Sequence, residues 1–107
     1  GVVNIGGTQT IYGNVTINQG KLDASEDEKA QLQALIEQLN TAIKQLPEED
    51  AEVIETLTQD AVDEASKDKP NRRLLEIKGE NLKQAAQNLA AVAPIVGQIV
   101  RRLLIAV

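Results

Sequence analysis

The last third of the chain, residues 71–107, reads NRRLLEIKGENLKQAAQNLAAVAPIVGQIVRRLLIAV. Its apolar residues recur at three- and four-residue steps, and a leucine or valine returns every seventh position: Leu75, Leu82, Leu89, Val96 and Leu103. Such a period is typical of an α-helix with one buried face. The pattern predicts one long helix from about residue 71 to about residue 106. We expect a kink at Pro94, because proline removes a backbone hydrogen bond and clashes with the preceding turn.

Two shorter helical patterns precede this segment. The first begins with a capping box formed by Ser25 and Glu28 and carries an apolar stripe as far as Leu46. The second follows Pro47, a residue suited to the first turn of a helix. Short connections favour antiparallel neighbours. The sequence therefore predicts an antiparallel three-helix bundle over residues 22–107, in which the last helix is long and kinked.

The beginning of the chain has a different character. Residues 1–20, GVVNIGGTQTIYGNVTINQG, hold no charged side chain and consist largely of β-branched, amide and glycine residues. β-Branched runs separated by glycine pairs are typical of short strands joined by tight turns. We therefore expect residues 1–21 to form a β-hairpin or a three-stranded meander, so that the fold class is α+β. Nothing in this segment would blunt the edges of such a sheet, so it either packs on the helices or pairs with other copies.

The composition excludes several classes of function. The chain of 107 residues has a net charge of -5, and it lacks His, Cys, Met, Trp and Phe. Without His or Cys there is no common general base, thiol nucleophile or transition-metal ligand. A net negative charge opposes nucleic-acid binding, and the single aromatic residue, Tyr12, offers no platform for stacking bases. We therefore expect no catalytic residue, no metal and no cofactor.

Charge is distributed unevenly along the chain. Fourteen of the acidic residues lie in residues 22–69, whereas residues 70–107 are basic on balance. Glu48, Glu52 and Glu55 share one helical face, which we interpret as a solvated surface and not a metal site. The basic pairs 72–73 and 101–102 could contact a phosphate or an acidic partner, and we favour pairing with the acidic second helix.

Residues 89–107 are almost entirely apolar. The two arginines among them oppose a membrane span, because each costs about 2.5–3.5 kcal/mol at the centre of a bilayer. Two short amphipathic helices cannot cover such a tail, so we expect part of it to form a helical interface with another copy. The residues predicted for that interface are Ile95, Ile99, Val100, Leu103 and Leu104. The alternative is a membrane-active helical effector that acts through residues 89–107.

These patterns predict a non-enzymatic module for homotypic assembly or protein–protein interaction, located in the cytoplasm. Its partner would be a second copy or a related module; a membrane surface is the alternative partner, and nucleic acid is not expected. The residues predicted for strand assembly are Val3, Ile5, Ile11, Tyr12, Val15 and Ile17.

Part of the uncharged segment at residues 1–20 resembles known signalling motifs. Residues Val3-Asn4-Ile5-Gly6 resemble the tetrad of RHIM-type amyloid motifs, with Asn in place of the usual Gln. The wider pattern, as far as Ile17, is similar to the leaders of bacterial conflict and programmed-death proteins, which precede small helical adaptor or effector-associated modules. The resemblance implies a module of a larger signalling or defence protein that oligomerises or recruits partners.

Overall fold

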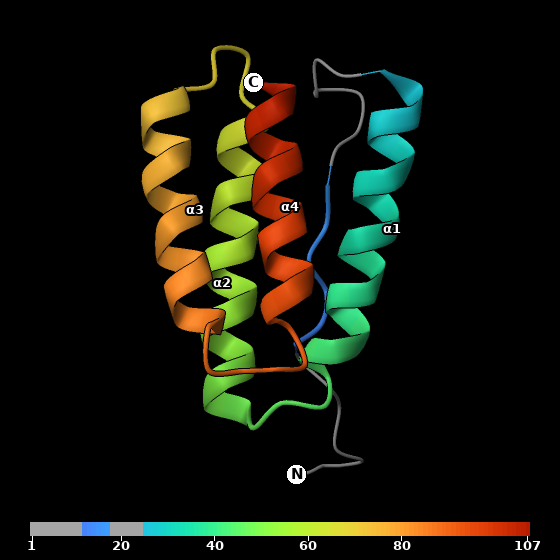
Figure 1. Cartoon of the computed structure of the whole chain (residues 1–107), viewed down its shortest axis with the longest axis vertical. Helices are drawn as coiled ribbons and strands as arrows, with labels where there is room; N and C mark the ends of the chain where they lie inside the picture. The colour runs from blue at the N-terminus through green and yellow to red at the C-terminus, as the bar shows by residue number, and fades with distance from the viewer. Residues whose placement is uncertain (1–11, 18–24) are drawn as a thin grey trace, which may run out of the picture.

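The computed structural model describes residues 12–17 and 25–107, and within these residues the chain is a bundle of four α-helices (Figure 1). The helices are α1 (Glu26–Ile43), α2 (Glu48–Ala65), α3 (Arg72–Ala86) and α4 (Ala93–Ala106). Each helix runs antiparallel to the one before it. The described residues contain no β-strand, so the predicted α+β class is wrong, while the predicted helical bundle is confirmed in outline.

The single long helix predicted over residues 71–106 is also wrong, because the chain turns back at residues 87–92. Leu89 and Val92 each donate a backbone hydrogen bond three residues back, to Ala86 and Leu89, and Val92 is fully buried. Pro94 lies in the first turn of α4. Proline costs nothing there, since the amides of the first turn have no intrahelical acceptor. Pro94 therefore starts a helix and does not kink one.

Caps fix the other helix ends. The side chain of Ser25 accepts a hydrogen bond from the Glu28 amide at 3.2 Å, which confirms the predicted start of α1. Asn71 caps α3 in the same way, through a 2.9 Å bond from the amide of Leu74. Pro47 is the residue immediately before α2, one position earlier than its predicted place inside the helix.

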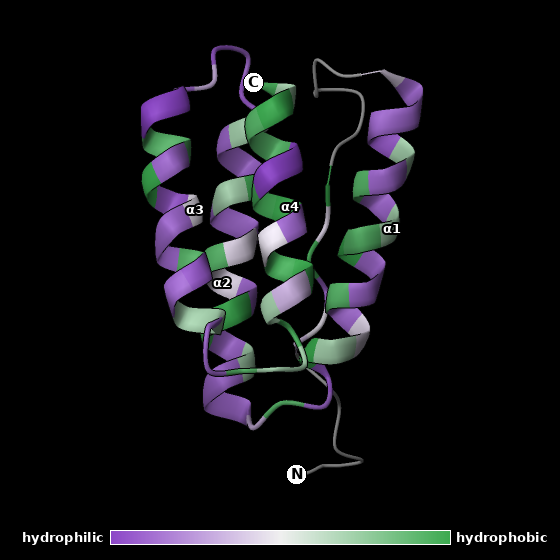
Figure 2. Ribbon diagram, viewed as in Figure 1, coloured by the Kyte–Doolittle hydropathy of each residue, from purple (hydrophilic) through white to green (hydrophobic). Residues whose placement is uncertain are grey.

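Helix α4 lies at the centre of the packing and contacts each of the other three helices. It is the most apolar of the four, as its colour in Figure 2 shows. Ile99 and Leu103 are fully buried and Val100 nearly so, so one copy covers much of the tail that was expected to need a second copy, while Ile105 is 61% exposed. The turn at residues 87–92 brings α3 back along α4, and α3 supplies the missing cover. Within the described chain, no helix combines the length and the apolar character needed to cross a bilayer.

Gly79 permits the close approach of α3 to α4. A β-carbon at this position would lie 2.7 Å from Cγ1 of Val100, well inside van der Waals contact. Val100 is buried and β-branched, so its side chain has little freedom to move away. The interruption that Gly79 makes in the apolar pattern of α3 therefore has a packing cause.

We predict that Gly79→Ala lowers the free energy of unfolding by about 1–2 kcal/mol, because overpacking outweighs the gain in helix propensity. Gly97→Ala is the matched control, since nothing lies within 4 Å of its added β-carbon. This second substitution should raise stability by up to about 1 kcal/mol. Urea denaturation followed by circular dichroism measures both, and equal effects of the two substitutions would contradict the packing argument.

Candidate functional site: an extended segment held between two helices

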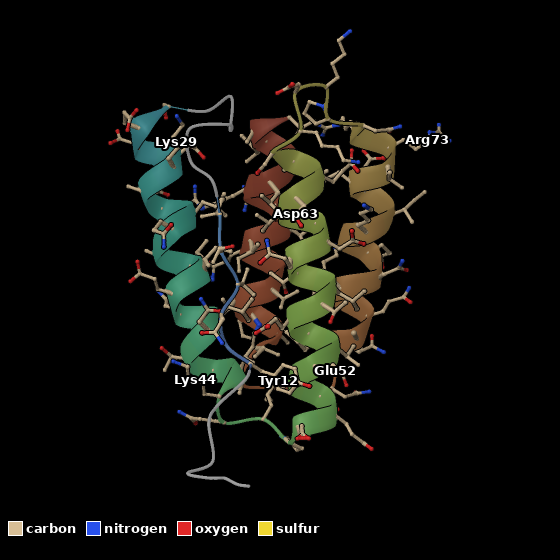
Figure 3. The ribbon with its side chains drawn as sticks, turned by 180° about the vertical axis from the view of Figure 1, so that it is seen from behind. Tyr12, Lys29, Lys44, Glu52, Asp63 and Arg73 are labelled. Atoms are coloured by element: carbon tan, nitrogen blue, oxygen red, sulfur yellow. The ribbon has the colours of Figure 1, made fainter. Side chains whose placement is uncertain are left out.

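Residues 12–17 form an extended segment that lies between α1 and α2 (Figure 3). The segment runs antiparallel to α1, because Gly13 lies beside Lys44 whereas Val15 binds Asn40, one turn earlier in the helix. It runs parallel to α2, because Gly13 binds Glu55 whereas Thr16 binds Gln59, one turn later. Backbone groups in such a position need hydrogen-bond partners other than a neighbouring strand. Side chains of the two helices provide them.

Two side-chain amides each bind both backbone groups of one residue. The Val15 amide donates to Oδ1 of Asn40 at 2.8 Å, and Nδ2 of Asn40 donates to the Val15 carbonyl at 3.0 Å. From the other side, the Thr16 amide donates to Oε1 of Gln59 at 3.0 Å, and Nε2 of Gln59 donates to the Thr16 carbonyl at 2.9 Å. A residue in an antiparallel sheet exchanges the same two bonds with its partner. Asn40 and Gln59 therefore take the place of neighbouring strands, and we call these two residues the amide clamp.

A carboxylate and a glycine complete the arrangement. The amides of Gly13 and Asn14 both donate to Oε1 of Glu55, at 2.9 Å for Asn14. Gly13 has a φ of 90°, and a β-carbon there would lie 2.7 Å from the carbonyl oxygen of Asn40. Both the backbone conformation and the lack of space require glycine at this position.

One side chain of the segment anchors it in the core. Val15 is 3% exposed and belongs to the same apolar cluster as the helices, while Tyr12 and Ile17 are half-buried against that cluster. Partial burial raises the pKa of the Tyr12 phenol above its usual value of 10, and the nearby carboxylates of Glu52, Glu48 and Glu55 act in the same direction. The segment is therefore recognised mainly through its main chain, with one deeply buried valine.

The structure places the residues predicted for strand assembly as follows. Tyr12, Val15 and Ile17 contact the core of their own copy. Val3, Ile5 and Ile11, together with the tetrad at residues 3–6, lie outside the described residues. Sequence reasoning missed Asn40 and Gln59. A signal was present for Asn40, which is an amide placed between the buried stripe residues Leu39 and Ile43.

The residues predicted for the helical interface mostly face inward. Ile99, Val100 and Leu103 are buried, whereas Ile95 and Leu104 are half-buried. The three residues of the predicted acidic face, Glu48, Glu52 and Glu55, also differ in exposure. Glu48 and Glu52 are exposed, but Glu55 is half-buried and binds the backbone of the segment. Among residues 12–17 and 25–107, no group of His, Cys, Asp and Glu side chains could hold a metal ion.

Among the residues that the structure describes, the most deeply buried charge is the carboxylate of Glu64, which is 1% exposed. It accepts from Lys67 at 2.8 Å, from the Asn71 amide at 3.0 Å and from Lys78 at 3.4 Å. These bonds, the one from Lys67 most of all, outweigh burial and lower the pKa of Glu64 to about 2. Hydrogen bonding to Asp60 at 3.0 Å raises the pKa of Lys78 in turn. Glu64 thus joins the end of α2 to the start of α3 and has a structural role.

Comparisons with protein families, with curated protein sequences and with solved structures find no significant match for this chain.

We predict that Asn40→Ala lowers the free energy of unfolding by about 2–3 kcal/mol, because it leaves both backbone groups of Val15 without partners inside the protein. Gln59→Ala should cost about 1 kcal/mol, because the backbone of Thr16 reaches water. Gln38→Ala, on an exposed position of α1, is the control and should change stability by less than about 0.5 kcal/mol. Urea denaturation measures all three. A cost for Asn40→Ala no larger than that of the control would contradict the clamp.

We predict a pH dependence from Glu64. Its folded pKa of about 2 lies below the usual glutamate value of 4.5, so its contribution to stability is complete above about pH 4.5 and is lost as the pH falls toward 2. Glu64→Gln should therefore be less stable than the wild type by about 1.5–3 kcal/mol at neutral pH, and this difference should shrink in acid. Glu49→Gln, on an exposed position of α2, is the control. Thermal unfolding between pH 2 and about 7 measures the trend, and a difference independent of pH would contradict it.

Proposed function

We propose that this chain is a non-enzymatic interaction module that self-associates by exchanging the segment at residues 12–17 between copies. In an isolated copy the segment occupies the site between α1 and α2; in an assembly it occupies the same site of a partner. The observation that carries the proposal is the pair of two-bond contacts from Asn40 to Val15 and from Gln59 to Thr16.

The chemistry of the site supports this proposal. Recognition through the main chain plus one buried side chain is how sheet edges capture extended peptides from other proteins. Here the amide clamp replaces the sheet edge, and the buried Val15 gives selectivity. A second copy carries the same segment, so it is an occupant of the correct chemistry.

The connectivity of the chain is compatible with exchange. Seven residues join Ile17 to Ser25, and seven extended residues reach up to about 25 Å. Exchange keeps every contact of the site and changes only which copy supplies the segment, so it has a low thermodynamic cost. The concentration of the protein then decides between the closed copy and the assembly.

The proposal agrees with what the resemblance to RHIM-type leaders implies, a module that oligomerises, and it assigns the assembly to residues 12–17. Membership of a larger signalling or defence protein remains a prediction from that resemblance alone. The apolar side chains of α4 are largely buried, and for this reason we favour a protein partner over a membrane.

We predict that two complementary variants form a heterodimer. The segment variant carries Val15→Asp, so its segment no longer fits, while its clamp is intact. The receiver variant carries Asn40→Ala and Gln59→Ala, so its clamp is lost, while its segment is intact. Refolded together from urea, they should give a one-to-one species in native mass spectrometry, because only one arrangement pairs an intact segment with an intact clamp.

The single tyrosine provides a second readout. With Tyr12→Leu added to the segment variant, all fluorescence comes from the segment of the receiver variant, and its anisotropy should rise on mixing. The receiver variant alone, at the same total protein concentration, is the control, and its anisotropy should not rise. Two folded variants that never combine would contradict the proposal.

Wild-type protein gives a test that does not depend on the folding of variants. A synthetic peptide of residues 10–19 in excess should reduce the dimer fraction at high protein concentration, and the same peptide with Val15→Asp should not. A wild type that stays monomeric at every concentration would overturn segment exchange, and so would a dimer fraction that neither peptide changes.

A further inference from the structure

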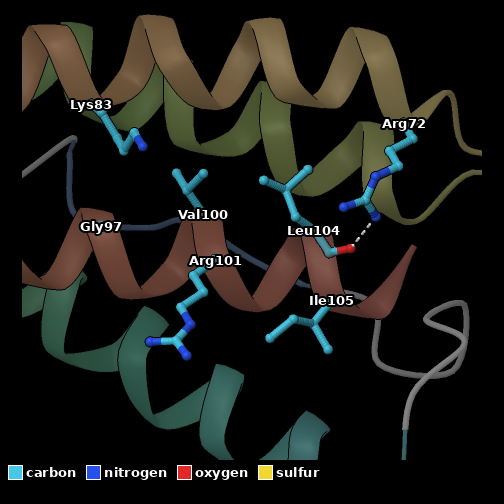
Figure 4. Close-up of a pocket in the computed structure, with 7 residues that line it drawn as sticks. All are labelled: Arg72, Lys83, Gly97, Val100, Arg101, Leu104 and Ile105. Atoms are coloured by element: carbon cyan, nitrogen blue, oxygen red, sulfur yellow. Dashed lines mark hydrogen bonds between the residues drawn. The ribbon is translucent and has the colours of Figure 1, made fainter.

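A groove between α3 and α4 combines an apolar floor with positive charge. It has a volume of about 660 Å³ and is lined by Arg72, Lys83, Gly97, Val100, Arg101, Leu104 and Ile105 (Figure 4). In Figure 4, Val100 and Leu104 point between the two helices, while Arg72 and Lys83 lie toward opposite ends of the groove on α3. Arg101 and Ile105 lie on its α4 side. None of its lining side chains is acidic, although Arg72 pairs with Glu76 at 3.5 Å and Lys83 pairs with Glu80 at 3.9 Å, both on exposed positions of α3.

Two of the lining residues are unusually available for a partner. Ile105 is 61% exposed, the highest value among the large apolar side chains of the described chain. Arg101 is exposed and makes no ion pair within residues 12–17 and 25–107. Arg72 is held in place by a 2.7 Å bond from its Nη1 to the carbonyl oxygen of Leu104. An apolar floor with cations at its rim fits an amphipathic helix whose polar side chains are acidic.

The same chain carries such a helix. The exposed stripe of α2 consists of Glu49, Glu52, Val53, Thr56, Asp60 and Asp63. Val53 is 47% exposed in the middle of the acids, and Glu49 and Glu52 make no ion pair with any described residue. The stripe therefore presents one exposed apolar side chain among acidic ones, which suits a groove that combines apolar and basic side chains.

The spacing of the charges matches. Arg72 and Lys83 are eleven residues apart on α3, and Glu52 and Asp63 are eleven residues apart on α2. Eleven residues are close to three helical turns, so each pair lies on one face with a rise of about 16 Å. Placing Glu49 and Glu52 at the Lys83 end of the groove puts Asp63 at the Arg72 end, and Val53, one residue after Glu52, then meets the part of the groove next to Lys83.

One copy cannot fill its own groove with its own stripe. Helix α4 lies in front of α2 in Figure 1 and behind it in Figure 3, so the groove and the stripe are on opposite faces of the bundle. We infer that the α3–α4 groove of one copy binds the acidic stripe of α2 of a second copy. Such a contact joins two different surfaces, so it repeats from copy to copy and gives chains or rings.

This inference is independent of segment exchange, because it uses different residues and a different kind of interaction. Contacts between exposed charges are screened by salt, whereas the exchanged segment is held by hydrogen bonds and apolar burial. Sedimentation velocity of the wild type should therefore show a molar mass that rises with protein concentration at low salt and returns to that of the salt-resistant species in about 0.5 M NaCl.

Charge reversal provides the sharpest test. The groove variant carries Lys83→Glu and Arg101→Glu; the stripe variant carries Glu49→Lys and Glu52→Lys. Asp63 is left unchanged because it also accepts a hydrogen bond from Gln59 of the clamp. Each variant alone should lose about tenfold or more of the low-salt association constant, because like charges then face each other. An equimolar mixture should regain it, since each reversed surface meets its complement.

The matched control carries Lys29→Glu and Lys44→Glu, the same change of charge at two positions of α1, which does not line the groove, and it should associate like the wild type. The inference is overturned if the wild type shows no salt-sensitive association. It is also overturned if the groove variant has the same low-salt association constant as this control, or if the mixture of the two variants associates no more tightly than either variant alone. Flotation with vesicles of phosphatidylcholine and phosphatidylglycerol tests the other occupant. Binding that is lost in the groove variant, without self-association of the wild type, would assign the groove to anionic lipid and also overturn the inference.

Discussion

The structure depends on one constraint, the need to satisfy the main chain of residues 12–17 between two helices. A helix satisfies its own backbone, but an extended segment does not, and a buried amide or carbonyl without a partner costs about 1–3 kcal/mol. Asn40, Gln59 and Glu55 meet this requirement from α1 and α2. Direct contacts between α1 and α2 are sparse, since the segment lies between them. The distance between these two helices is therefore set by the segment.

The same requirement appears at the other end of α2. There the chain leaves one helix and enters the next through residues 66–71, and the buried carboxylate of Glu64 binds the Asn71 amide at the start of α3. Lys67 and Lys78 neutralise that carboxylate within 3.4 Å. A buried charge is tolerated only with such partners. In both places a polar side chain of a helix holds a piece of non-helical backbone.

The helices and their buried faces could be predicted from the sequence, because the stripes of α1 and α2 follow a helical period that burial enforces. The turn at residues 87–92 could not. Its residues are compatible with a continuous helix, and proline near position 94 suits either a kink or a helix start. Packing decides: two helices of 15 and 14 residues cover each other beside partners of 18, whereas one long helix would leave its apolar end in water.

The extended segment shows a second limit of sequence reasoning. The β-branched residues around Val15 do indicate extended backbone, but they do not say what its hydrogen-bond partners are. A strand and a clamped segment have the same local sequence, and they differ only in whether the partner is another backbone or a pair of side-chain amides. The informative residues are therefore not in the segment. They are the amides and the carboxylate on the faces of α1 and α2 that border the core, and such polar residues beside a buried stripe deserve a search for the backbone that they bind.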